Sequence, residues 1–453
     1  MTSNFEHLRE TVLDLTKRDQ QELAFMLLDN YWEIAHLPDD YELLGWLSLK
    51  IGHRTLAIKC AESMLGFAST NKEKYAARIN LNKVYYRANF PEKALFYSQL
   101  NLDIDPHDFD NVVAYAAALK LNNQREESEK VINELKQCDW ITPEQRLQLR
   151  ITDTHSLLRQ GQTAQGIKWF LHSDKDRTTI FDIKGMKQWN GVISPGTVLY
   201  VNAGGGVGDE IINIRFFNTL KKLGMTPCLF SLLERPDLAQ IFQRHGFDVI
   251  TNPNEIDIKC PWTYMMSLPI DLNVNENQLW YGPYLAPLNQ QKNQLPKTDK
   301  FRIGIKCNGN PWFEQDVYRS IPFEEVMQIM PKDAEIYYFD KDDSKVGCIN
   351  LNLRINTWDD TLDFLSQMDI VISSCTSIIH AVGAMGITGI VCVPILEYYI
   401  WTSTHTNEST PWYGSNLKVL KQKKVRSWKE PLERAQEIIQ EHMQLKGSQQ
   451  NAN

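Results

Sequence analysis

The sequence predicts an α-helical repeat array followed by two Rossmann-like α/β domains with a cleft between them. The first third repeats a helix–turn–helix pattern and contains no convincing strand, whereas strand-like and helical runs alternate from about residue 197. A segment rich in Pro, Asn and aromatic residues, at residues 252–300, is expected to be irregular and separates two such alternations. Alternating strands and helices are typical of parallel sheets. We expect the array at residues 1–180, the first α/β domain at 190–295 and the second at 296–453.

Length and composition are those of a soluble protein with several domains. The 453 residues are enough for two or three domains, and an apolar content of 43% is ordinary for a globular chain. No apolar run approaches the roughly 18 residues of a membrane span, and the amino-terminal residues lack the layout of a signal peptide. The eight cysteines form no C-x-x-C pair. We therefore expect reduced thiols and a cytoplasmic location.

The charge pattern argues against two classes of function. A net charge of −8 disfavours non-specific binding to nucleic acid, which needs a basic surface. The acidic run at residues 340–343 lacks the further ligands of a metal site, so no metal is expected. A basic run at residues 418–426 is interpreted as a solvated loop before the last helix, with a site for an acidic partner or a phosphate as the alternative.

Four copies of a helical pair make up the expected array. They begin near residues 43, 80, 112 and 155, and a small residue opens each second helix. These small residues, at intervals of 37, 34 and 38, are Ala57, Ala94, Ser128 and Gly166. A period near 34 is that of the tetratricopeptide repeat (TPR), whose paired helices approach closely. A generic helical bundle is the alternative. Such arrays bury their apolar faces against their neighbours, and typically bind a protein partner or dock onto an attached domain.

A glycine-rich loop follows the first strand expected in the α/β region, at residues 197–201. Its glycines are Gly204, Gly205, Gly206 and Gly208. A strand, a glycine turn and a helix suit phosphate binding, but the stretch matches neither G-x-G-x-x-G nor the Walker pattern. Glycine lets a ligand come close to the backbone. Asp209, which opens the helix, is either a first-turn carboxylate that caps it or a general base facing the cleft.

Hydroxyl side chains mark the start of another helix, after the strand expected at residues 369–374. They belong to Ser373, Ser374, Thr376 and Ser377. Hydroxyls and free backbone N–H groups at a helix start form an anion site that a diphosphate would fit. Ordinary N-capping by Ser374 or Thr376 is the alternative. His380 shares the helical face of Thr376, and is either a buried, satisfied histidine or a phosphate or sugar contact.

Two more segments follow expected strands. One places Lys306 and Arg319 near a strand end and a helix start, where an arginine could hold a phosphate in a bidentate way. Solvated surface charge is the alternative there. The other, at residues 394–414, carries aromatic side chains that could stack on a base or a sugar or could belong to the core, the interpretation we favour for Trp412.

These motifs, in this order, resemble the GT-B glycosyltransferases, above all the TPR-containing bacterial and phage proteins related to the heptosyltransferases (glycosyltransferase family 9-like). The resemblance is carried by G-x-G-D at residues 206–209, G-N-P and R-S-I-P at 309–322, T-x-x-x-H-x-x-G-A-x-G at 376–386 and P-W-Y at 411–413. It covers residues 197–440 and, more loosely, the helical third. Cys375 stands where many relatives have Asp.

The resemblance implies transfer of a sugar from a nucleotide-diphosphate sugar to an acceptor hydroxyl, with no metal and no cofactor. The acceptor, a saccharide, a protein or a modified nucleic acid base, would lie near the glycine loop, with Asp209 as the base. The residues implied for the nucleotide sugar are Lys306, Asn310, Arg319, Ser374, Thr376, Ser377 and His380. Cys375 keeps a non-catalytic TPR/GT-B scaffold open as an alternative, and another nucleotide-sugar enzyme such as an epimerase is a third hypothesis.

Overall fold

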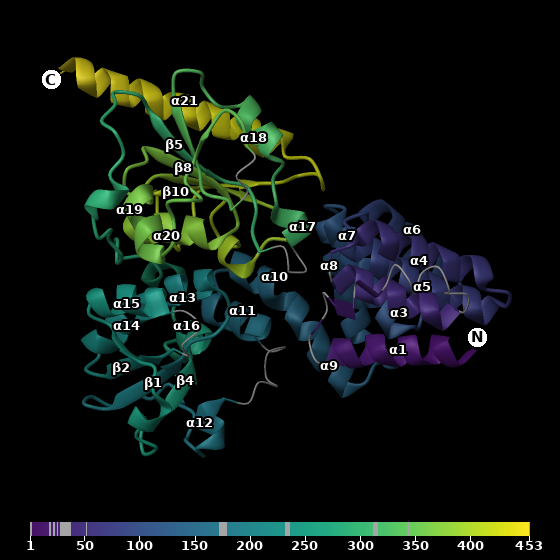
Figure 1. Ribbon diagram of the computed structural model, residues 1–453. Coiled ribbons are helices and arrows are strands. Elements are labelled where there is room, and N and C mark those ends of the chain that lie inside the picture. Colours follow the sequence, from purple (N-terminus) through teal and green to yellow (C-terminus); the bar gives the residue numbers. More distant parts are fainter. Residues whose placement is uncertain are drawn as a thin grey trace.

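The computed structural model describes residues 2–17, 20, 23–24, 26–27, 38–50, 52–171, 179–231, 236–310, 316–341 and 345–452. Figure 1 shows a helical part, in purple and blue, beside two α/β parts that lie one above the other. The fold class predicted from the sequence is confirmed: a helical array precedes two separate, fully parallel sheets. Over the described ranges, no helix is both long and apolar enough to cross a membrane.

The array consists of helices that pack against their neighbours along the chain. They are α1 (Thr2–Lys17), α3 (Pro38–Lys50), α4 (Arg54–Phe67), α5 (Asn71–Arg87), α6 (Pro91–Leu102), α7 (Phe109–Leu121), α8 (Arg125–Gln137), α9 (Pro143–Leu149), α10 (Thr154–Arg159) and α11 (Thr163–Phe170). The short helix α12 (Ile180–Ile183) does not belong to the array, because its Phe181 packs against Tyr200, Phe230 and Trp262 of the first sheet. The four expected copies are the pairs α3/α4, α5/α6, α7/α8 and α10/α11. Local signals set their starts: Thr70 forms a capping box with Glu73 on α5, and Pro91 occupies the first position of α6.

The small residues that open the second helices lie where the helices of a pair meet. Ala57 and Ala94 are fully buried, and the Ser128 hydroxyl donates to the carbonyl of Ala116 at 2.6 Å. At Gly166 a Cβ atom would lie 2.7 Å from Cγ of Leu158, closer than real contacts allow. The close approach of paired helices that the sequence indicated is therefore present in these pairs.

The first sheet belongs to the lower α/β part in Figure 1. Its strands, in spatial order β3-β2-β1-β4, are β1 (Val198–Asn202), β2 (Thr226–Phe230), β3 (Asp248–Ile250) and β4 (Trp262–Tyr264). Its helices are α13 (Val207–Asn213), α14 (Arg215–Lys222), α15 (Pro236–Arg244) and α16 (Leu268–Asp271). The expectation that residues 252–300 are irregular is wrong at β4, whose three residues are too few to show an alternating pattern.

The second sheet has the spatial order β10-β9-β8-β5-β6-β7. Its strands are β5 (Arg302–Lys306), β6 (Glu335–Tyr338), β7 (Ile349–Asn350), β8 (Ile370–Ser374), β9 (Gly389–Val393) and β10 (Leu417–Lys421), and its helices are α17 (Asp316–Arg319), α18 (Phe323–Gln328), α19 (Trp358–Leu365), α20 (Ser377–Met385) and α21 (Lys429–Ala452). Strands β8 and β9 are buried throughout, as expected for central parallel strands. The interpretation of residues 418–426 as a loop is wrong for their first part, which lies in β10.

The two α/β parts share one hydrophobic core, which includes residues of both sheets and of α13 and α20. Arg215 on α14 is fully buried at this junction. Its guanidinium donates to the carbonyls of Leu279 and Trp412 and to the hydroxyl of Tyr284, and lies over four aromatic rings. No carboxylate among the described residues forms an ion pair with it. Carbonyl dipoles and ring faces therefore stabilise this cation in place of an anion.

Candidate active site

The strand order places a ligand crevice in each sheet. If the strands of the second sheet are numbered 1 to 6 from β5 to β10, their spatial order is 3-2-1-4-5-6, which is the order of the Rossmann fold. The first sheet has the first four strands of that order, 3-2-1-4. The order reverses direction between β5 and β8 in the second sheet and between β1 and β4 in the first. Ligands bind beyond the carboxyl ends of the strands at such switch points. Lys306 ends β5, Ser374 ends β8 and the glycine loop follows β1, so these candidate residues lie at the expected edges.

Asp209 is the third residue of α13, and both of its carboxylate oxygens accept hydrogen bonds. The backbone N–H of Gly206 donates to Oδ2 at 2.7 Å, and the hydroxyl of Tyr398 donates to Oδ1 at 3.0 Å. The first bond caps α13. The side chain is half-buried, while Gly205 and Gly206 beside it are exposed. Asp209 is therefore a capping residue that is only half-buried.

No side chain of the described residues caps the start of α20. Thr376 is its N-cap residue but makes no side-chain capping bond, because its hydroxyl is shared with Ser373 at 3.1 Å. The Ser374 hydroxyl is buried and finds no partner among the described residues. The N-capping predicted as the ordinary alternative for Ser374 or Thr376 is thus wrong. Free N–H groups at a helix start carry partial positive charge, so this turn can hold an anion.

Arg319, at the end of α17, lies against this turn. Its Nη1 donates to the carbonyl of Cys375 at 2.8 Å, and its Nε pairs with Asp316 at 2.8 Å. The side chain is 19% exposed. Arg319 is therefore not a freely solvated surface charge, and its guanidinium adds positive charge beside the start of α20.

Lys306 is the last residue of β5, and Asn310 lies on the loop that follows this strand. The Lys306 ammonium pairs at 2.6 Å with Asp340, a buried carboxylate that also accepts the backbone N–H groups of Cys307 and Asn308. Asp340 thus holds the end of β5, which explains part of the acidic run without a metal. Asn310 is exposed. Residues 311–315 and 342–344, which complete these two motifs, lie outside the described residues.

His380 is buried on α20. Its Nδ1 lies 3.0 Å from the hydroxyl of Tyr413, and its ring stacks on Trp401 with centroids 5.3 Å apart. Burial, and next the positive charges of Arg215 and Arg319, lower the pKa of His380 to about 3. The imidazole is neutral at physiological pH, which agrees with the buried, satisfied interpretation. Any contact with a ligand would be made by a neutral ring.

The helix starts of the two α/β parts meet directly. A Cβ atom at Gly208 would lie 2.9 Å from Cδ2 of His380 and 3.5 Å from Cα of Ser377. Helices α13 and α20 also lie side by side in Figure 1. Tyr398, from the loop after β9, adds the hydroxyl bond to Asp209. The structure therefore places Gly208, the residue before Asp209, against the start of α20.

Tyr398 was not among the candidate residues, although it lies in the aromatic segment at residues 394–414. That segment is mostly core: its fully or nearly buried rings are Tyr399, Trp401, Trp412 and Tyr413. Tyr398 is only half-buried. Nothing in the sequence distinguishes its hydroxyl from that of Tyr399, because the distinction depends on which ring faces α13.

Glu397, also missed, is the centre of a buried charge cluster. Its side chain is inaccessible to solvent and pairs with Arg125 at 2.8 Å, Lys421 at 2.6 Å and Arg159 at 3.5 Å. Burial by itself raises the pKa of a carboxyl, but Lys421 and Arg125 outweigh it, and the pKa of Glu397 falls to about 2. Because Arg125 and Arg159 come from the array, Glu397 fixes the array to the second α/β part.

Cys375 precedes the α20 start and is half-buried. Its Sγ lies 3.6 Å from the carbonyl of Cys392, and burial raises the pKa of the thiol to about 12. The side chain is therefore a neutral, packed group at physiological pH. An aspartate at this position would change the charge beside Arg319.

Fold and site together define a GT-B-type α/β protein with an amino-terminal helical array. The chain is similar to a family 9 glycosyl transferase from Veillonella parvula, at 10% identity and a TM-score of 0.36 over 52% of this chain and 88% of that one. It is also similar to an O-GlcNAc transferase from Thermobaculum terrenum, at 10% identity and a TM-score of 0.38 over 98% of this chain and 93% of that one. ADP-heptose LPS heptosyltransferase II from E. coli is similar at 10% identity and a TM-score of 0.35, over 55% of this chain and 100% of that one. No protein-family model and no curated protein matches the chain.

Proposed function

We propose that the protein is a glycosyltransferase that moves a sugar from a nucleotide-diphosphate sugar to an acceptor hydroxyl, with Asp209 as the general base. The contact between the start of α13 and the start of α20, at Gly208 and His380, is the observation that carries the proposal. The proposal is that this contact lets the Asp209 carboxylate and the start of α20 act together, since a base and an anion site are the two groups that such a transfer needs.

In the proposed reaction the diphosphate of the donor lies at the α20 start. The free N–H groups of that turn and the Arg319 guanidinium stabilise the negative charge of the departing nucleotide diphosphate. The acceptor hydroxyl lies over the exposed Gly205 and Gly206, where no side chain keeps it from the carboxylate. Asp209 takes the proton of that hydroxyl as the oxygen attacks the anomeric carbon. The proposal needs no metal, because the helix start and Arg319 supply the positive charge.

A competing interpretation is that Asp209 only caps α13. Both functions use the carboxylate, so removal of the whole side chain would not separate them. The substitution Asp209→Asn does separate them, because the amide oxygen still accepts the Gly206 N–H but cannot take a proton at neutral pH.

We expect Asp209→Asn to lower kcat by 100-fold or more while the protein remains folded and binds donor as before. Tyr398→Phe is the matched variant: it removes the other hydrogen bond to the carboxylate and leaves the base in place. Turnover of a UDP-, GDP-, ADP- or CMP-sugar, identified first by its thermal shift, measures kcat. Full activity of Asp209→Asn would exclude Asp209 as the base.

A non-catalytic scaffold is the second candidate, and Cys375 is the observation that favours it. Its neutral thiol occupies a position beside Arg319 where relatives carry a charge. If no nucleoside diphosphate binds the native protein in calorimetry, the scaffold interpretation is supported and the transferase proposal fails. Binding of a nucleoside diphosphate that Arg319→Gln weakens would instead support the transferase.

A further inference from the structure

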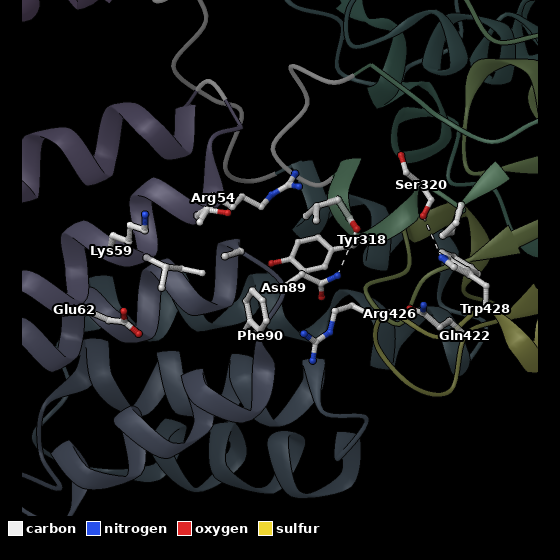
Figure 2. Close-up of a pocket in the computed structure, with 15 residues that line it drawn as sticks. Arg54, Lys59, Glu62, Asn89, Phe90, Tyr318, Ser320, Gln422, Arg426 and Trp428 are labelled. Atoms are coloured by element: carbon white, nitrogen blue, oxygen red, sulfur yellow. Dashed lines mark hydrogen bonds between the residues drawn. The ribbon is translucent and has the colours of Figure 1, made fainter. Parts of the chain in front are cut away.

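The contact between the array and the second α/β part includes two regions. Figure 2 shows the first, where Asn89 and Phe90 of the array lie beside Tyr318 of α17. Hydrogen bonds from Asn89 to the carbonyl of Val317 and from Tyr318 to the carbonyl of Tyr86 join the two parts there. The second region is formed by α10 and α11, which Figure 1 places between the other array helices and the two α/β parts. This second region lies against the candidate active site.

Residues 397–402, which we call the connecting segment, lie between the second region and the candidate active site. The segment follows β9 and contains one 3₁₀ turn, Tyr399–Trp401. Within the described part of the chain, its backbone hydrogen bonds join its own residues to one another. These bonds close the turn but do not attach it to a sheet. Side-chain contacts therefore set where the segment lies.

The array holds both ends of the connecting segment. Glu397, at its start, pairs with Arg125 of α8 at 2.8 Å and with Arg159 of α10 at 3.5 Å. Thr402, at its end, has its hydroxyl oxygen 2.8 Å from Nδ1 of His155 on α10. Charged and polar groups of the array thus fix the segment at its two ends.

An aromatic ring of the array contacts the middle of the segment. Phe170, the last residue of α11, meets the ring of Tyr398 at a centroid distance of 5.1 Å and an angle of 90°, and that of Tyr399 at 4.6 Å and 46°. Edge-to-face contacts are favourable and depend on the orientation of both rings. Tyr399 is fully buried and also contacts Trp412, whereas Tyr398 is half-buried. Loss of the Phe170 ring should therefore disturb Tyr398 more than Tyr399.

The other side of the segment reaches the proposed base. The hydroxyl of Tyr398 donates to Oδ1 of Asp209 at 3.0 Å, and the N–H of Gly206 donates to Oδ2 at 2.7 Å. Two donors, one on each oxygen, define the plane of the carboxylate. Gly206 belongs to the same turn as Asp209, whereas Tyr398 belongs to a segment that the array holds. The orientation of the carboxylate thus depends on two consecutive contacts, from Phe170 to Tyr398 and from Tyr398 to Asp209.

We propose that Phe170 is a positioning residue for the transfer: its ring orients Tyr398, whose hydroxyl orients the Asp209 carboxylate towards the acceptor hydroxyl. This inference rests on the proposed function, in which Asp209 is the base. Orientation matters because a general base must lie within hydrogen-bond reach of the proton that it abstracts. The array is then part of the catalytic apparatus as well as a surface for partners.

The competing interpretation is that Phe170 only fills space in the shared core, against which it packs. A space-filling ring and a positioning ring both contribute to stability, so a melting temperature does not separate them. A double-mutant cycle does, because two residues that act through the same hydrogen bond have non-additive effects on kcat. A residue that only fills the core would leave kcat unchanged or lower it independently of the Tyr398 hydroxyl.

Turnover of the UDP-, GDP-, ADP- or CMP-sugar identified by its thermal shift is measured for Phe170→Leu, Tyr398→Phe and the double variant. We expect Tyr398→Phe to lower kcat about tenfold and Phe170→Leu about fivefold, with the KM for the donor unchanged. The double variant should be about as slow as Tyr398→Phe, since without the hydroxyl the ring has nothing to position. Phe109→Leu is the matched control, because Phe109 is a buried ring of the array that lies in a separate apolar cluster. It should lower the melting temperature and leave kcat unchanged.

Three results would overturn this inference while the proposed function stands, with Asp209→Asn inactive in the same assay. Phe170→Leu could turn over at the native rate. The double variant could be about fiftyfold slower than the native protein, so that the two losses multiply and Phe170 acts independently of the hydroxyl. Phe109→Leu could lose as much kcat as Phe170→Leu, which would indicate a general loosening of the array. Full activity of Asp209→Asn would instead overturn the proposed function, and the positioning role with it.

Discussion

Replacement of Glu397 by glutamine should destabilise the protein strongly. The pKa of this buried carboxyl is about 2, against an ordinary value of 4.5. That difference corresponds to roughly 3 kcal/mol of free energy of unfolding, supplied by the cations around the charged form. Because the pKa is lowered on folding, this contribution is fully present above about pH 4.5 and is lost as the pH falls towards 2. At pH 7 the substitution removes all of it and leaves Arg125 and Lys421 without their anion.

We therefore expect Glu397→Gln to lower the free energy of unfolding by about 3–5 kcal/mol at pH 7, the range for a broken buried ion pair. The control is Glu408→Gln. Glu408 pairs with Arg434 at 2.8 Å, but both side chains are 37% exposed. Exposed pairs contribute about 0–1 kcal/mol, so this variant should be nearly as stable as the native protein.

Urea unfolding followed by tryptophan fluorescence and by circular dichroism measures both variants. Because the chain has several domains, each transition is analysed separately, and the transition in which the array separates from the second α/β part should shift most. Equal losses in the two variants would refute the reasoning, since burial would then make no difference to the ion pair. A loss below about 1 kcal/mol for Glu397→Gln would refute it as well.

Two further predictions concern the candidate site. Because the pKa of His380 falls from 6.5 to about 3 on folding, the unfolded chain binds the proton more tightly, and the free energy of unfolding should fall by up to about 1.4 kcal/mol per pH unit below 6.5. In urea unfolding between pH 7 and 5, the slope of this free energy against pH should be smaller by that amount in His380→Gln than in the native protein. An unchanged slope would contradict the buried neutral ring. Gly208→Ala should destabilise the contact of α13 with α20 by about 1–3 kcal/mol, because its methyl would lie 2.9 Å from the His380 ring. The control is Gly206→Ala, whose methyl would lie 3.5 Å from the nearest Asp209 oxygen. Equal losses of stability in thermal melts of the two variants would exclude the steric explanation.

Most of the fold could be predicted because its signals are local. Apolar runs marked β5, β8 and β9, and small residues at a period near 34 marked the helical pairs. Strand β10 was missed because its two lysines resemble a solvated run. Lys421 is exposed at the end of this edge strand, and its partner Glu397 is not readable from neighbouring residues.

The sequence predicted the glycine loop and the start of α20 as two separate segments, and contact between them was a hypothesis. Glycines after β1 and hydroxyls before α20 are visible in the sequence, because a loop at a strand end needs those residue types. The contact of Gly208 with His380 and the bond from Tyr398 to Asp209 depend on how two domains pack. Side chains that only the tertiary structure brings together, including the array residues on Glu397, carry no local pattern. The roles of the candidate residues therefore remain predictions for the experiments above.

The buried guanidinium of Arg215 limits how substrates could enter. Rigid-body opening of the two α/β parts would pull Arg215 away from the carbonyl of Trp412 and expose the ring faces that surround it. Such a hinge movement would break a shared core as well as these bonds. We therefore expect exchange of substrate and product to use short-range movements of surface segments, above all the chain around Gly205 and Gly206, while the two sheets keep a fixed mutual orientation through each turnover.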